Sequence, residues 1–134
     1  MVLSEDSIRL KAVNHLTYAV KDKERALRFW VDVLGVKQIP SQVESERVLW
    51  LQLPSGTMVH LIENADAPSV PSHHGAFEVD DIDKAFETLR AKGIETETET
   101  ITNIRKDGQR AFYFHDTEGN RIEICTKSGF GVLV

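Results

Sequence analysis

Along the first half of the chain, apolar residues form strand-like patterns before and after one segment where they recur at helical spacing. Residues 11–20 are rich in apolar and β-branched side chains without a breaker, which predicts a strand. Apolar residues then recur at helical spacing, so we expect a helix that Asp22 caps and Gly35 ends. Residues 36–43 predict a weak strand, which Pro40 favours at a sheet edge. Alternation on both sides of a Pro-Ser-Gly turn predicts a hairpin of residues 47–53 and 57–63.

The same order of elements starts again after a linker that contains two prolines. Residues 74–79 predict a strand, and a second helix is expected between Asp81 and Gly93. The remaining expectations are a short strand at 94–98, a mobile polar loop at 99–108, and a hairpin of residues 110–116 and 120–126.

This restart indicates an internal repeat of two βαβββ modules. The modules cover about residues 11–63 and 74–127, and the linker covers 64–73. Neither module is large enough to bury both faces of its sheet, so we expect one domain over residues 1–134. The predicted class is α+β, with a cupped mixed sheet and the helices on its outer face.

Four residues with metal-binding side chains fall at related places in the two modules. His15 and His74 open equivalent strands, and His60 and Glu123 lie in equivalent hairpin strands. Side chains alternate along a strand, so each of the four should face away from the helices if its apolar neighbours face them. The same alternation places Thr17, Trp50, Tyr113 and Arg121 in the cavity. These four residues lie on the same predicted face as the candidate ligands.

Three imidazoles and one carboxylate suit Zn, Ni, Co, Mn or Fe as a divalent ion better than Ca or Mg. A six-coordinate ion would keep two positions open for substrate or water. A single histidine on a strand is more often structural, and we interpret His73, beside His74, as incidental. Four such residues on one predicted face are much less often a coincidence.

Composition excludes some partners. The chain has 134 residues and a net charge of −5, which argues against nucleic acid as a partner. No apolar run approaches the ~20 residues of a membrane span, so no membrane partner is expected. The single cysteine, Cys125, fits a reducing compartment, and we expect a cytoplasmic protein.

The chain resembles the vicinal oxygen chelate superfamily, which includes glyoxalase I, bleomycin-resistance proteins, extradiol dioxygenases and fosfomycin-modifying thiol transferases. The similarity covers about residues 11–127. It is carried by Asn14-His15-Leu16-Thr17, by His74-Gly75-Ala76-Phe77, and by the ending from Phe112 to Ile124. The resemblance implies His15, His74 and Glu123 as ligands, with His60 where glyoxalase I places a fourth.

The resemblance also implies an activity. We expect a glyoxalase-type isomerase or lyase that chelates a small substrate through neighbouring oxygens and works through a metal-stabilised enediolate. Glu123 would move the proton and Tyr113 would bond the oxyanion. Thr17, Trp50, Arg110 and Arg121 would contact the substrate, and a cation of the Arg105-Lys106 loop would close over an anionic end.

Two alternatives keep the fold and change the function. The first is a fosfomycin-type thiol transferase, with a thiol co-substrate, or an extradiol dioxygenase. The second is a protein that sequesters a drug or metabolite without catalysis. The resemblance also implies a homodimer, because cups in this superfamily combine one module of each kind, either within a chain or across a swapped dimer.

Overall fold

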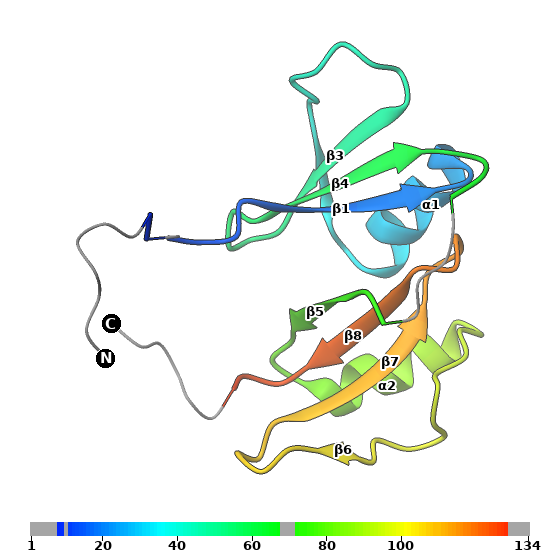
Figure 1. Cartoon of the computed structure of the whole chain (residues 1–134). Helices are drawn as coiled ribbons and strands as arrows, with labels where there is room; N and C mark the ends of the chain where they lie inside the picture. Colours follow the sequence, from blue (N-terminus) through cyan, green and yellow to red (C-terminus); the bar gives the residue numbers. More distant parts are fainter. Residues whose placement is uncertain (1–7, 10, 68–71, 129–134) are drawn as a thin grey trace.

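The computed structural model describes residues 8–9, 11–67 and 72–128, and its secondary structure follows the predicted repeat (Figure 1). The elements of the first repeat are β1 (His15–Val20), α1 (Lys23–Arg28), the π-helical turn η1 (Phe29–Val33), β2 (Lys37–Ile39), β3 (Val48–Gln52) and β4 (Met58–Glu63). Those of the second are β5 (His74–Glu78), α2 (Ile82–Ala91), β6 (Asn103–Ile104), β7 (Arg110–His115) and β8 (Arg121–Cys125).

Each repeat forms its own four-stranded mixed sheet, and the α+β class is confirmed. The strand orders are β1-β4-β3-β2 and β5-β8-β7-β6. β1 pairs in parallel with β4, β5 pairs in parallel with β8, and the other neighbours are antiparallel. β2 lies at a sheet edge, as Pro40 predicts. The described strands of one chain therefore form two sheets, and β1 and β5 are free edges of these ladders.

Both helices start at the predicted caps. The side chain of Asp22 accepts a hydrogen bond from the backbone N–H of Arg25 at 3.1 Å, and Asp81 accepts from Lys84 at 3.0 Å. These bonds satisfy backbone donors that have no partner within the helix. Gly35 has a positive φ of 70°, which ends the first helical segment in the left-handed region.

The prediction for residues 94–98 is wrong, because this segment makes only an isolated bridge between Thr96 and Phe114. The fourth strand of the second sheet is β6, inside the stretch predicted as a loop. The hydroxyl of Thr96 donates to the carbonyl of Thr98, and that of Thr98 donates to Thr100, each at 2.7 Å. Such local side-chain bonds compete with a strand ladder.

One apolar core joins the two repeats. Trp30 of η1 is 1% exposed, and its ring lies 5.7 Å from that of Phe77 in β5. Phe29 contacts Phe114 of β7, with 6.3 Å between ring centroids. The α1–η1 segment therefore packs against the sheet of its own repeat and also against strands of the second sheet.

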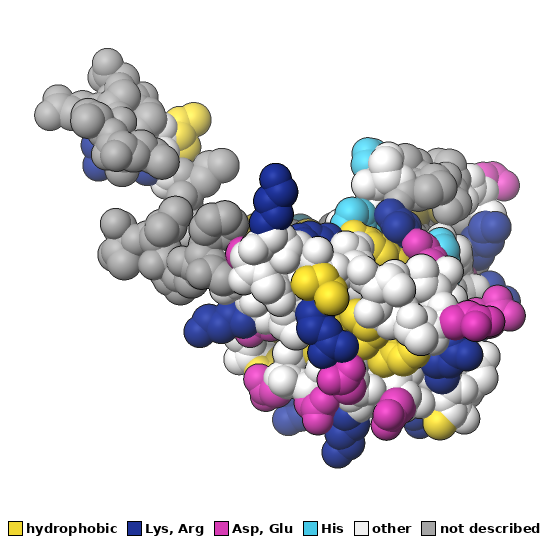
Figure 2. Space-filling view, turned by 90° about the horizontal axis from the view of Figure 1, so that it is seen from below, with side chains coloured by type: hydrophobic (Ala, Val, Ile, Leu, Met, Phe, Trp, Pro, Cys, Tyr) yellow, Lys and Arg dark blue, Asp and Glu magenta, His cyan; other side chains and the backbone are white. Residues whose placement is uncertain are grey.

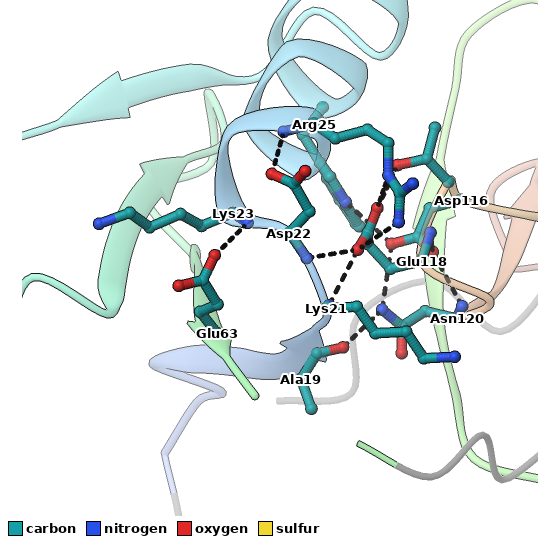
Figure 3. A network of polar contacts seen from close by, with 11 residues as sticks. Ala19, Lys21, Asp22, Lys23, Arg25, Glu63, Asp116, Glu118 and Asn120 are labelled. Carbon is teal, nitrogen blue, oxygen red and sulfur yellow. Dashed lines mark hydrogen bonds and ion pairs between the residues drawn. The ribbon is translucent and has the colours of Figure 1, made fainter. Parts of the chain in front are cut away.

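A polar network reinforces this contact (Figure 3). The carboxylate of Glu118, in the β7–β8 turn, points at the start of α1 and accepts from the backbone N–H groups of Lys21 and Asp22. Arg25 pairs with the same carboxylate, and the indole N–H of Trp30 donates to Asp116 at 3.3 Å. These polar bonds, of which the one between Trp30 and Asp116 is buried, thus hold the two repeats together.

The surface carries charges of both signs. On the face seen from below, basic and acidic side chains are interspersed and separate small apolar areas (Figure 2). Among the described helices, none has the length and apolar character needed to span a membrane.

Candidate active site

The first half of the candidate site is a stack of three rings on β1, β3 and β4. The ring of His60 lies 4.2 Å from that of Trp50 and 4.0 Å from that of His15, with small angles between the planes. The neighbours of His60, Val59 and Leu61, are fully buried in the core. His60 therefore faces away from the helix, as the alternation predicts.

Two hydrogen-bonding features prepare these imidazoles to act as ligands. The Nδ1 atom of His15 lies 2.8 Å from the side-chain oxygen of Asn14, which favours a free Nε2. The Nε2 atom of His60 is buried and makes no hydrogen bond within the described residues. Burial, and then the neighbouring His15, lower the pKa of His60, which favours its neutral form.

The second half of the site lies on β5 and β8. The Nε2 atom of His74 lies 3.0 Å from Oε1 of Glu123, whose residue is 5% exposed. Ile122 and Ile124, on either side of Glu123, belong to the core, so Glu123 also faces away from it. The other oxygen of Glu123 accepts from Arg105 at 3.4 Å.

Tyr113 of β7 lies beside this pair. Its hydroxyl accepts from Arg105 at 3.2 Å, and its ring meets that of His74 edge-on at 5.4 Å. The guanidinium of Arg121 lies 3.9 Å above the Tyr113 ring. Burial raises the pKa of the Tyr113 phenol, and a hydrogen bond with Glu123 acts in the same direction.

The structure thus brings the predicted ligands together as two pairs. No group of three or more His, Cys, Asp or Glu residues with metal-binding geometry occurs in the described part of the chain. Thr17 lines a pocket of about 270 Å³ together with His74 and Arg121. Arg110 lies apart from all of these, because it pairs with Asp83 of α2 at 2.8 and 3.1 Å on the opposite face of β7.

Two neighbours of Tyr113 make contacts that the sequence did not predict. Arg105 was expected as a loop cation, but alternation could not show that it reaches Glu123. Glu97 pairs with Arg121, and it lies in the segment wrongly predicted as a strand. No periodic signal marks either residue, since both lie outside regular elements that alternation describes.

The donors present fit a transition metal ion. Two imidazoles on one repeat and an imidazole with a carboxylate on the other make an N/O donor set. The buried Nε2 atom of His60 has no hydrogen-bond partner among the described residues, so its lone pair can bind an ion. One pair alone has too few donors for a stable metal site, so metal binding requires the two pairs to lie around the same ion.

Comparisons with known proteins agree with this fold. Residues 12–124 match the family model of the Glyoxalase/Bleomycin resistance protein/Dioxygenase superfamily. The chain is 31% identical over 128 residues to the protein YwkD of Bacillus subtilis, covering 86% of this chain and 96% of YwkD. It is 29% identical over 125 residues to the metallothiol transferase FosB of Staphylococcus haemolyticus, covering 89% of this chain and 86% of FosB.

A solved structure is similar over nearly the whole chain. The crystal structure of a glyoxalase family protein from Bacillus anthracis superposes with a TM-score of 0.78 at 25% identity, covering 91% of this chain and 99% of the other. The family match spans both repeats, including β1 and most of β8. The chain therefore belongs to the Glyoxalase/Bleomycin resistance protein/Dioxygenase superfamily, also known as the vicinal oxygen chelate superfamily.

Proposed function

We propose that the chain is a metal-dependent, glyoxalase-type isomerase or lyase whose working form is a homodimer with two composite sites. In each site, His15 and His60 of one copy meet His74 and Glu123 of the other. The observation that carries this proposal is that the two ligand pairs lie at equivalent places of a repeat, both on the face away from the core. In the described chain neither pair belongs to a group of three or more His, Cys, Asp or Glu residues that could hold a metal ion.

The arrangement of the repeats supports the dimer. Glu118, Asp116 and Trp30 hold the two repeats of one chain together, and neither β1 nor β5 has a second ladder partner, although Gly75 of β5 lies against Leu16 and Tyr18 of β1. A two-fold pair of chains can bring β1 of one copy beside β5 of the other, which would give the predicted cup. The partner copy then supplies half of each ligand set.

Each residue has a role in such a site. A bound divalent ion would supply Lewis acidity toward neighbouring oxygens of a small substrate. The Glu123 carboxylate would carry a proton between adjacent substrate carbons, and the Tyr113 hydroxyl would donate to the oxygen that gains charge. Trp50 would stack on the substrate, and Arg105 would pair with an anionic end.

A thiol transferase is the second candidate. Its support is the similarity to the metallothiol transferase FosB, together with the shared pocket of Thr17, His74 and Arg121. In this reaction a thiol would add to a small electrophile in the same cup. The ligand set is common to both candidates, so only substrate tests separate them.

Metal content and turnover of the full chain test the proposal. The purified protein is stripped with a chelator and reloaded separately with Zn, Ni, Co, Mn or Fe, and bound metal per chain is measured. The loaded forms are assayed with the hemithioacetal of methylglyoxal and glutathione, and with fosfomycin plus a thiol. We expect one ion per chain, and turnover in one assay that His74→Ala and Glu123→Gln abolish.

His73→Ala is the matched control, because it removes an exposed imidazole next to His74. It should keep both the metal and the activity. Full activity in the stripped protein, or normal metal content in His74→Ala, would refute the metal site. Metal binding without turnover in either assay would refute both reactions and leave the ligand assignment standing.

A further inference from the structure

We propose that Glu97 is a positioning residue of this site, which acts by holding Arg121 against the ring of Tyr113. The inference rests on the role proposed for Tyr113. It assigns Arg121 to the support of the site, although the sequence suggests it as a substrate contact. Arg105 is then the cation that faces the substrate.

The contact between Glu97 and Arg121 has two points. The Nε atom of Arg121 donates to Oε2 of Glu97 at 2.7 Å, and its Nη2 atom donates to Oε1 at 2.8 Å. Two parallel bonds fix the plane of a guanidinium as well as its position, which a single bond does not. Both side chains are mostly covered, with 24% and 30% exposed, so solvent competes only partly for these bonds.

The plane that Glu97 fixes is the one that covers Tyr113. The guanidinium carbon of Arg121 lies 3.9 Å from the centre of the Tyr113 ring, within the range of a cation–π contact. His74 meets the edge of the ring, and Arg105 bonds its hydroxyl. These three neighbours, together with the hydrogen bond to Glu123, define the direction of the hydroxyl, and the neighbour on the ring face depends on Glu97.

The backbone ties Glu97 to the same strand as Tyr113. The N–H of Glu97 donates to the carbonyl of Tyr113 at 2.8 Å, beside the bridge between Thr96 and Phe114. The carboxylate therefore keeps its place relative to the ring that it helps to fix. The hydrogen bond from Arg121 lowers the pKa of Glu97 despite partial burial, which keeps the group ionised.

Arg121 and Arg105 have different partners in this site, which indicates different roles. The two N–H groups of Arg121 that face Glu97 both donate to its carboxylate, and the flat face of the guanidinium lies on the Tyr113 ring. Arg105 instead directs its guanidinium at the Tyr113 hydroxyl and at Glu123, the two groups with proposed roles in the reaction. An anionic end of the substrate would meet Arg105.

A spectroscopic comparison tests the inference without a substrate. The chain has two tyrosines, so selective ring labelling gives two sets of NMR signals, which Tyr113→Phe assigns. We expect Glu97→Gln to shift the Tyr113 ring signals and to leave those of Tyr18 in place. Arg121→Lys, which keeps the charge but loses the planar fork, should give the same pattern.

Asp83→Asn is the matched control. It breaks a two-point pair of similar geometry, with Arg110, on the other face of the strand that carries Tyr113. This variant should leave the Tyr113 signals unchanged. Unchanged Tyr113 signals in both Glu97→Gln and Arg121→Lys would overturn the inference. Equal shifts in Asp83→Asn would also overturn it, because they would indicate only a general loosening of the sheet.

Kinetics supply the second readout. With whichever substrate the wild type turns over, Glu97→Gln should lower kcat roughly tenfold and change KM little, and Glu97→Asp should restore part of kcat. A change confined to KM would indicate that Arg121 contacts the substrate, and it would contradict the positioning role of Glu97. Should the wild type turn over neither substrate, the proposed reactions fail, and the NMR comparison still decides the role of Glu97.

Discussion

The Nε atom of Arg25 donates a hydrogen bond of 2.7 Å to Oε2 of Glu118, and this bond crosses from one repeat to the other. The carboxylate side chain is fully covered, whereas 47% of the arginine side chain is exposed. The same carboxylate accepts from two backbone N–H groups and from the hydroxyl of Thr117. Glu118 is therefore the centre of the contact, and Arg25 is one of several partners.

We expect Glu118→Gln to destabilise the protein by about 2 kcal/mol, because it leaves buried donors without a charged acceptor. Arg25→Gln should cost less, since solvent already screens the guanidinium. Urea unfolding of both variants measures the difference. A loss from Arg25→Gln equal to that from Glu118→Gln would contradict the central place of the carboxylate.

The stability should also depend on acid through Glu118. Burial disfavours its charged form, but the bonds from Arg25, Asp22, Thr117 and Lys21 outweigh burial and lower its pKa from 4.5 to about 2. Because the folded pKa is the lower one, the stabilisation is complete above about pH 4.5 and is lost as the pH falls toward 2. Urea midpoints across this range should fall less steeply in Glu118→Gln than in the wild type.

Mixing two inactive variants tests how the ligand pairs meet. His15→Ala damages the first repeat and His74→Ala damages the second. In a mixed dimer of the proposed kind, one site carries both defects and the other carries neither. Unfolding and refolding the two together should therefore restore up to about a quarter of wild-type activity and metal content. No recovery in a preparation where mixed dimers are detected would show that the pairs do not combine across copies.

Gly75→Ala should disturb the edge strand that presents His74. A Cβ atom at this position would overlap the hydroxyl of Tyr18 and lie 3.1 Å from atoms of Leu16 and Phe77. We expect a loss of roughly 1–3 kcal/mol, as for other overpacked sites. The double variant with Tyr18→Phe removes the overlapping hydroxyl and should regain part of the loss in thermal melts. A double variant no more stable than Gly75→Ala alone would contradict this explanation.

The sequence predicts those parts of the site that follow from alternation within a strand. His60 and Glu123 each lie between apolar residues that must reach the core, and this alone sets their direction. Residues outside regular strands lack such a signal, so the contact of Glu97 with Arg121 could not be foreseen. The separation of the ligands into two pairs depends on how the repeats pack, which no local pattern encodes.

The predicted substrate contact of Arg110 is a different case, because the alternation rule was available for this residue. The resemblance implies a substrate contact for Arg110, but Phe112 and Phe114 turn this face of β7 toward the core. Arg110 therefore meets Asp83 of α2. Applying the alternation rule to Arg110, as to Tyr113, would have separated the two.

The burial of Trp30 between the repeats has a thermodynamic consequence. Its ring loses its surroundings if either half opens, because Phe77 and Asp116 come from the second half. The halves should thus melt in a single cooperative transition, rather than as two independent folding units. An ion bound by His74 and Glu123 would then protect the whole chain from heat, including the distant first helix.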